Sequence, residues 1–392
     1  MPAVAGLCGN RPDIARFLDT TVDGIIPKLM GGLAAPKQPR LVKQGVCQEV
    51  VITKDIDLRQ LLPVPTFHEF DSAPFITAGI LAVRDGGINL ISIRRMQMLE
   101  GNKLSILIES PGLWQKYAAA EKEGKPLEVA IMFGVHPLIT LTSQINSAQY
   151  GVDKFAVAQA LTSENIELVS GKTVDIPVLT SSEIVLEGRM IPHQRRTEGP
   201  FGEIAGYYGP ASEQPYVEVS AVTMRRNPWF ETIFPGSHEH KLPNALNREV
   251  GLFLTVANAV PGVQRVHVTM PGAGRFHAIV AIRKETDGDG KTAIYAALAA
   301  NKDFKHVVVV DDDVDIFDPY DVEWALATRV QASRDVVIIP GAKGSTLDPS
   351  HLWQGVTDKM GIDATVPLKD RERMARPKIP KQLDPRDYVE RL

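Results

Sequence analysis

The chain has 392 residues, of which 44% are hydrophobic and 23% charged, proportions typical of folded globular proteins. The formal net charge of -4 argues against a molecule covered by a nucleic-acid-binding surface. The two cysteines, Cys8 and Cys47, cannot build a disulfide framework, and no apolar run approaches the roughly 18 residues that span a bilayer. We therefore expect a cytoplasmic protein without a membrane or nucleic-acid partner.

The N-terminal part predicts a shortened α/β domain over residues 1–70. Apolar residues at helical spacing predict a helix over residues 13–30, and a Gly/Pro-rich break follows and ends at Pro39. An extended segment then stops at L-L-P-V-P, residues 61–65, because proline interrupts regular structure.

Short β-rich runs dominate residues 71–240. Two predicted helices, 113–122 and 153–161, interrupt them. Many short strands separated by turns are typical of a barrel-like β domain. The predicted strands fall within residues 78–83, 88–94, 104–109, 127–133, 176–190 and 216–224.

Strands and helices alternate after Pro235, which predicts a separate α/β domain over residues 241–368 and an α+β fold overall. Asp318 is expected to cap the last predicted helix. Residues 369–392, rich in Lys, Arg and Pro, predict an extended tail, which either packs on a partner subunit or stays exposed. The predicted helices of the α/β domain are 242–260, 292–301 and 319–329, and its strands are 263–270, 278–282 and 307–310.

The segment with the most chemical information is E-G-P-F-G-E, in which Glu198 and Glu203 bracket a turn. Glycine and proline bend the backbone tightly here, so the two carboxylates can converge although they are five positions apart. Because close carboxylates do not both ionise readily, one is expected to have a raised pKa and to donate protons. A nearby arginine would hold the other carboxylate ionised. The alternative reading is a surface turn with two solvated glutamates.

This segment, followed by G-Y at residues 206–207, resembles the signature of the UbiD family, E-G-P-[FY]-G-[ED] and then G-Y. The run S-I-R-R-M-Q at residues 92–97 resembles the strand of that family that ends in a catalytic arginine. The resemblance implies a central split β-barrel of flavin-reductase type between the two α/β parts. It extends over most of the chain, through residues 182–188, 310–315, 344–350 and 359–365.

The resemblance implies reversible decarboxylation of an aromatic or α,β-unsaturated carboxylic acid with prenylated FMN, which a separate flavin prenyltransferase supplies. It implies that Arg95 holds the substrate carboxylate and Glu198, that Glu198 completes this ion pair, and that Glu203 is the acid/base. It also implies a homo-oligomer, either a dimer or a hexamer. The residues expected to contact the cofactor are Ser92, Ile93, Arg94, Lys154 and Lys359.

Members of the family usually bind a divalent metal beside the flavin phosphate through an Asn, a His and a Glu. The resemblance places Leu90, Pro111 and Lys154 at those three positions. Asn89 is one residue away, and one step along a strand reverses the face of the side chain. Because none of the three replacements is a ligand that Mn²⁺ or Mg²⁺ prefers, we predict no divalent metal.

Two readings of this departure remain open from the sequence. The ammonium of Lys154 replaces the metal and, together with Lys359, binds the flavin phosphate. Alternatively, the flavin site has been lost, and the chain is a non-catalytic UbiD-like subunit of a carboxylase or decarboxylase assembly. A third hypothesis is a flavin-reductase-like enzyme with unmodified FMN.

Two further segments have both a metal-binding and a structural reading. H-E-H at residues 238–240 could supply a pair of metal ligands, but in a segment read as extended it favours a structural or substrate-pocket role. The acidic run at residues 311–321 lacks the glycine and terminal glutamate of an EF-hand. It therefore predicts the end of a strand followed by a capped helix.

Overall fold

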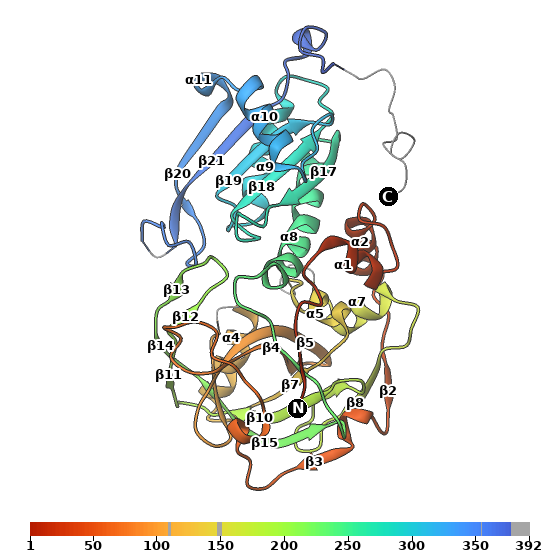
Figure 1. The fold of residues 1–392 in the computed structure, drawn as a ribbon, viewed down its shortest axis with the longest axis vertical. Helices are drawn as coiled ribbons and strands as arrows, with labels where there is room; N and C mark the ends of the chain where they lie inside the picture. The colour runs from red at the N-terminus through yellow and green to blue at the C-terminus, as the bar shows by residue number, and fades with distance from the viewer. Residues whose placement is uncertain (109–110, 147–150, 354, 378–392) are drawn as a thin grey trace, which may run out of the picture.

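The computed structural model describes residues 1–108, 111–146, 151–353 and 355–377. Figure 1 shows a β-barrel part at the bottom and an α/β part at the top, with helix α8 (His238–Ala259) running between them. The fold is the mixed α+β fold that the sequence predicts.

Within the described residues, six antiparallel strands form a closed barrel, because β10 pairs with both β7 and β15. Alternate residues of each strand face opposite sides, as the period of two requires. Leu81 and Val83 of β4 pack inside the barrel, whereas Ile80 and Ala82 pack against the outer helices and strands. Around the barrel, the strands are β10 (Ile184–Met190), β7 (Leu127–Phe133), β4 (Phe75–Asp85), β5 (Ile88–Met98), β6 (Lys103–Ile106) and β15 (Tyr216–Met224).

Residues 13–30 form parts of two helices rather than the single helix predicted. Helix α1 (Arg11–Phe17) ends before Asp19, whose φ of 50° is left-handed, and α2 begins at Ile25. The strands of the N-terminal part pair with later segments: β1 (Ala3–Val4) with β16 (Phe230–Glu231), β2 (Arg40–Val42) with β8 (Glu167–Ser170), and β3 (Val50–Ile52) with β15. The remaining elements here are α2 (Ile25–Ala34), η1 (Val46–Gln48) and α3 (Leu58–Leu61).

Helix α7 (Lys154–Leu161) is fixed to barrel strand β5 through the residue that caps it. One oxygen of Asp153 accepts from the backbone N–H of Phe155 at 2.9 Å, as an N-cap does. The other oxygen accepts from the backbone and side-chain nitrogens of Asn89, both at 2.9 Å. The first residue of α7, Lys154, is thereby held beside β5.

The barrel part also contains α4 (Pro111–Lys122), α5 (Pro137–Ser143), which the sequence did not predict, and β9 (Pro177–Leu179).

The α/β part is built on a sheet with the order β17, β18, β19, β21, β20 in the described residues. The central pairs β18–β19 and β19–β21 are parallel. As predicted, Asp318 caps a helix, and its carboxylate accepts from the N–H of Tyr320 at 2.9 Å. The elements are β17 (Val263–Val268), β18 (His277–Ile282), α9 (Asp289–Ala300), β19 (His306–Asp311), α10 (Pro319–Arg329), α11 (Ala332–Asp335), β20 (Val336–Lys343), β21 (Val356–Ala364) and η2 (Leu368–Asp370). Most of the predicted tail, residues 378–392, lies outside the described residues.

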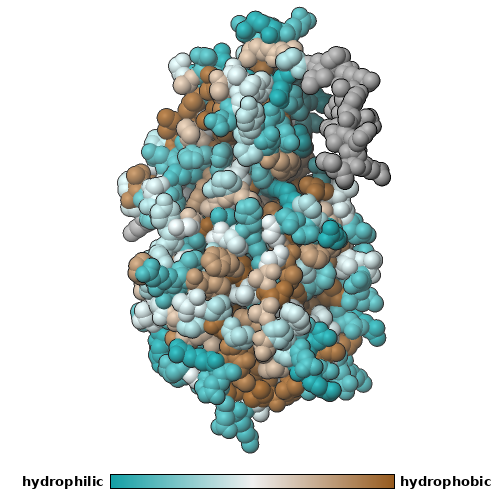
Figure 2. All heavy atoms as spheres, in the orientation of Figure 1, coloured by the Kyte–Doolittle hydropathy of each residue, from teal (hydrophilic) through white to brown (hydrophobic). Residues whose placement is uncertain are grey.

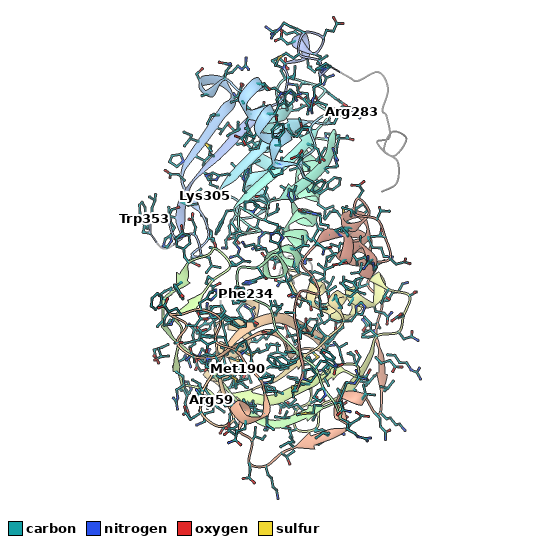
Figure 3. All side chains as sticks on the ribbon, viewed as in Figure 1. Arg59, Met190, Phe234, Arg283, Lys305 and Trp353 are labelled. Atoms are coloured by element: carbon teal, nitrogen blue, oxygen red, sulfur yellow. The ribbon has the colours of Figure 1, made fainter. Side chains whose placement is uncertain are left out.

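Polar and apolar residues are intermixed on the face seen in Figure 2. Among the described residues, no helix is both long and apolar enough to cross a membrane. Side chains fill the junction between the two parts, where Figure 3 labels Phe234. The ring of Phe234 packs edge to face against Phe67, with the ring centres 5.8 Å apart.

Candidate active site

A β-ribbon beside the barrel carries the two glutamates. Hydrogen bonds to barrel-side residues fix the turn between them: the N–H of Gly199 donates to the side-chain oxygen of Gln97 at 2.8 Å, and the N–H of Gly202 donates to Asp71 at 2.9 Å. The ribbon consists of two ladders, β11 (Arg196–Glu198) with β14 (Ser212–Gln214), and β12 (Phe201–Gly202) with β13 (Tyr208–Gly209).

Gly199 meets a backbone requirement of this turn. Its φ of +85° is in the left-handed region, and a Cβ at this position would lie 3.1 Å from the carbonyl oxygen of Pro210. Because glycine has no Cβ, it adopts the left-handed φ without strain and avoids the contact with the carbonyl oxygen. The tight turn after Glu198 is therefore encoded locally by the G-P-F-G run.

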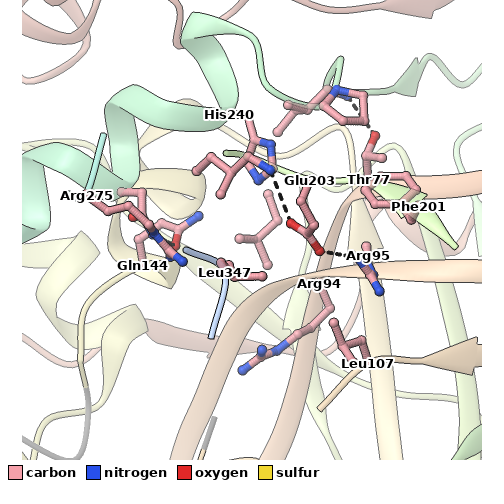
Figure 4. A pocket seen from close by; sticks show the side chains of 15 residues that line it. Thr77, Arg94, Arg95, Leu107, Gln144, Phe201, Glu203, His240, Arg275 and Leu347 are labelled. Atoms are coloured by element: carbon pink, nitrogen blue, oxygen red, sulfur yellow. Dashed lines mark hydrogen bonds and ion pairs between the residues drawn. The ribbon is translucent and has the colours of Figure 1, made fainter. Parts of the chain in front are cut away.

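Arg95, on strand β5, binds both glutamates. Its Nε and Nη2 donate to the two oxygens of Glu198 at 2.8 and 2.7 Å, and its Nη1 donates to Glu203 (Figure 4). The guanidinium also lies over the ring of Phe201, 4.9 Å from its centre. The family resemblance predicted that Arg95 binds Glu198, and the structure adds Glu203 as a second partner of Arg95.

The two glutamates differ in their access to solvent. The side chain of Glu198 is 0% exposed, whereas that of Glu203 is 12% exposed and lines a cavity. A buried carboxylate bound in parallel by a guanidinium is a fixed counter-ion. Glu203 is therefore the carboxylate of this pair that a bound molecule can reach.

The cavity beside Glu203 has a volume of about 210 Å³ and lies between the barrel and α8. Barrel residues form one side, and residues from the α/β part and from the segment that leads into α8 form the other. Three arginines, Arg94, Arg95 and Arg275, line it from both sides, and apolar side chains make up much of the remaining lining. Other residues that line it are Thr77, Gln144, Phe201, His240, Asn244 and Leu347.

His240 points its ring toward the carboxylate of Glu203 in Figure 4. The Nδ1 atom of the ring accepts from the N–H of Gly236 at 3.1 Å, which leaves the proton of a neutral ring on Nε2. Burial, followed by the charge of Arg275, lowers the pKa of His240 to about 4. At neutral pH the ring therefore offers Glu203 an N–H group without a further charge.

The prediction that residues 238–240 are extended was wrong. Ser237 caps α8 by accepting from the N–H of His240 at 3.3 Å, so these residues form the first turn of the helix. His240 lines the cavity, as one of the two readings expected, and His238 is exposed on the same turn.

A second cavity, of about 250 Å³, adjoins the first along strand β5. Ile93, Arg94 and Gln144 line both cavities. The sequence expected cofactor contacts from Ser92, Ile93, Arg94 and Lys154, and the structure brings all four to this second cavity.

The chain matches the two models of one protein family. Residues 40–238 match the 3-octaprenyl-4-hydroxybenzoate carboxy-lyase Rift-related domain, and residues 243–364 match the C-terminal domain of the same enzyme. The chain belongs to the UbiD family of carboxy-lyases.

Relatives in the UbiD family match the chain over almost its whole length. The anhydromevalonate phosphate decarboxylase of Methanothermobacter thermautotrophicus is 36% identical over 378 residues, which cover 96% of this chain and 88% of that protein. The gallate decarboxylase of Lactiplantibacillus plantarum is 32% identical over 419 residues, with coverages of 98% and 85%.

Two solved structures of a UbiD-class enzyme, HmfF from Pelotomaculum thermopropionicum, also match the chain. The complex with FMN has a TM-score of 0.95 and 46% identity, and it covers 99% of this chain and 87% of HmfF. An evolved dimeric form in complex with prenylated FMN (prFMN) has a TM-score of 0.90 and 42% identity, with the same coverages.

Lys359, expected at the flavin phosphate, is not among the described residues that line either cavity. It lies on β21 inside the α/β part, where its ammonium donates to the carbonyl oxygen of Lys302 at 3.0 Å. Because this side chain is buried and bonded within its own part of the fold, we do not retain it as a phosphate ligand.

The residues at the expected metal positions do not fit a divalent metal. Leu90 brings an aliphatic side chain to the second cavity, and Lys154 brings an ammonium. Asn89 is bonded to Asp153, and the side chain of Pro111 lies outside the described residues. In the part of the chain that the structure describes, no three or more His, Cys, Asp or Glu side chains gather where they could hold a metal ion.

Sequence reasoning missed several residues of the first cavity. Gln144, Asn244 and Arg275 come from three separate segments, and the side chain of Asn244 donates to that of Gln144 at 3.1 Å. None of them belongs to a recognisable motif, because the cavity forms only when α8 and the loop after β17 pack against the barrel. The G-A-G run at residues 272–274, directly before Arg275, is typical of a turn and does not indicate a cavity.

Proposed function

We propose that this chain reversibly decarboxylates small aromatic or α,β-unsaturated carboxylic acids with prenylated FMN, and that Glu203 is the proton donor. The observation that carries this proposal is the position of Arg95 between a fully buried Glu198 and a cavity-facing Glu203. The names of the relatives, which include gallate decarboxylase, and the prFMN complex of HmfF support it.

The second cavity fits the cofactor. Ser92, Ile93 and Arg94 present one stretch of β5 to it, and Lys154 faces it from α7. These four residues would hold the flavin and its phosphate. Prenylated FMN, when bound, supplies the electron sink that accepts charge as CO₂ leaves.

Arg95 has the hydrogen-bonding capacity to bind a substrate carboxylate. A guanidinium has five N–H donors, and within the described residues three of them bind Glu198 and Glu203. A substrate carboxylate would compete with Glu203 for Nη1, because both are anions facing one cation. Binding of the substrate would thus release Glu203, while the buried Glu198 keeps Arg95 in place.

The Glu203 carboxylate, once released from Arg95, can take up a proton from solvent and deliver it to the carbon that loses CO₂. The overall change is loss of CO₂ and gain of one proton at the same carbon, which requires an acid beside that carbon. The ring of His240, which also lines the cavity, points toward Glu203 (Figure 4). The arginines of the lining favour an anionic substrate, and the volume of about 210 Å³ favours a small one.

A flavin-free, non-catalytic subunit would have no need for this arrangement, so the complete set of Arg95, Glu198 and Glu203 favours the enzyme. Supply of the cofactor by a flavin prenyltransferase, assembly into a homo-oligomer and a cytoplasmic location remain predictions of the sequence.

Co-expression with a flavin prenyltransferase tests the proposed function. The purified protein would be incubated in D₂O with a panel of monocyclic aromatic and 2,3-unsaturated acids. We expect one CO₂ and one deuterium, at the carbon that carried the carboxylate, for each turnover. If protein with stoichiometric prenylated FMN releases no CO₂ from any of these acids, the proposed function is wrong.

A further inference from the structure

The second cavity carries cationic side chains on two of its walls. Lys154 faces it from the first turn of α7, and Arg94 faces it from β5. Among the described residues, no carboxylate forms an ion pair with Lys154. Lys154 is thus a buried cation without a carboxylate partner among the described residues, and such burial is costly.

Lys154 is held in place by the backbone and retains a donor. The residue is 5% exposed, and its ammonium donates to the carbonyl oxygens of Ile91 at 2.7 Å and Ser143 at 2.8 Å. An ammonium has three N–H donors. Within the described part of the chain, one N–H group therefore remains for a molecule in the cavity.

The surroundings of Lys154 disfavour the charged form of its side chain. Burial, followed by the charge of Arg94, lowers the pKa of Lys154 to about 7. A lysine on the solvated face of a helix would not be buried in this way. The carbonyl groups that accept from the ammonium compensate only in part for the free energy that its burial costs. A negatively charged ligand between Lys154 and Arg94 would remove the repulsion between the two cations.

We infer that Lys154, together with Arg94, binds the phosphate group of the flavin directly and takes the place of the divalent metal. This inference rests on the proposed function for the identity of the ligand. A phosphate monoester carries about -1.5 to -2 charges at neutral pH, so a cavity wall that carries cationic side chains attracts it. Leu90, beside Lys154 in this cavity, leaves no oxygen ligand for a metal where the family has one.

A comparison of FMN with riboflavin, which lacks the phosphate, separates this role from a general effect on folding. The binding constants of both flavins would be measured by fluorescence quenching for the wild type, Lys154→Met and Lys359→Met. Lys359 is a matched control, because it is also 5% exposed and its ammonium also bonds backbone carbonyls.

We expect Lys154→Met to weaken FMN binding about 10- to 100-fold, as the loss of a charge-assisted hydrogen bond does. Riboflavin binding should stay within about twofold in the same variant, and Lys359→Met should bind both flavins like the wild type. Unchanged FMN binding by Lys154→Met, or an equal loss for riboflavin, would overturn the inference. Neither result would bear on the proposed decarboxylation, which CO₂ release tests separately.

The wild type supplies a second test that does not depend on how the variants fold. Protein loaded with FMN should contain no stoichiometric Mn²⁺ or Mg²⁺, and dialysis against EDTA should leave the bound FMN in place. One equivalent of either metal, or release of FMN by EDTA, would show that a metal rather than Lys154 holds the phosphate.

Discussion

Arg95 and Glu198 form two parallel hydrogen bonds, from Nε at 2.8 Å and from Nη2 at 2.7 Å. This geometry fixes the plane of the guanidinium and directs Nη1 toward Glu203. The two carboxylates of the E-G-P-F-G-E turn therefore have different roles, since one is a permanent counter-ion and the other faces the cavity.

Glu198→Ala should destabilise the protein. The substitution leaves the guanidinium of Arg95 without its buried partner, and breaking such a pair costs about 3–5 kcal/mol of the free energy of unfolding. Urea denaturation followed by circular dichroism measures this change. Glu213→Ala, an exposed glutamate on the same ribbon, is the control and should change stability by about 0.5 kcal/mol or less. An equally small effect of Glu198→Ala would mean that the pair does not stabilise the fold.

His240→Phe should lower kcat by about tenfold and leave the FMN content unchanged, because it removes one hydrogen-bond donor that faces Glu203. His238→Phe, on the same helical turn but exposed, should have wild-type kcat. Steady-state kinetics of holoenzyme preparations would compare the two variants. Equal kcat values for both would remove His240 from the site.

The affinity for FMN should fall as the pH rises above about 7. The pKa of Lys154 in the free protein is about 7, so the free ammonium loses its proton above this pH. A bound phosphate favours the charged ammonium, and the complex therefore keeps the proton that the free protein has lost. The affinity for FMN should decrease by up to about tenfold per pH unit, since each unit of difference between the pKa of Lys154 in the complex and in the free protein corresponds to a tenfold change in affinity. The phosphate group of FMN itself titrates near pH 6, below the pH range in which Lys154 loses its proton.

Titrations with FMN between pH 6.5 and 9 would measure this dependence. Lys154→Met should show FMN affinity that is independent of pH above 7. The same slope in the wild type and in this variant would assign the titration to another group.

The E-G-P-F-G-E turn could be identified from sequence because its requirements are local. Gly199 must adopt a left-handed φ, and the run places both glutamates on one short ribbon. The short β-rich runs likewise predicted β7 and β15 with the bounds that they have. Local patterns of this kind do not depend on distant parts of the chain.

Residues whose position depends on tertiary packing were harder to predict. Lys359 lies in a family-like segment, but β21 buries it in the α/β sheet, away from both cavities. Conversely, Arg275 reaches the first cavity only because the loop after β17 lies near α8, and nothing in its neighbours along the chain indicates this. The motifs thus pointed to Glu203, the proposed acid, and to Arg95, but not to the opposite wall of the cavity.

The central claim is that Glu203 delivers the proton, and the rate of CO₂ release by Glu203→Gln tests it most directly. The variant would be compared with the wild type and with Glu213→Gln at equal occupancy by prenylated FMN. We predict a decrease of about 10²–10⁴-fold for Glu203→Gln, the usual contribution of a general acid, and none for Glu213→Gln. A rate for Glu203→Gln within a few-fold of the wild type would contradict the assignment.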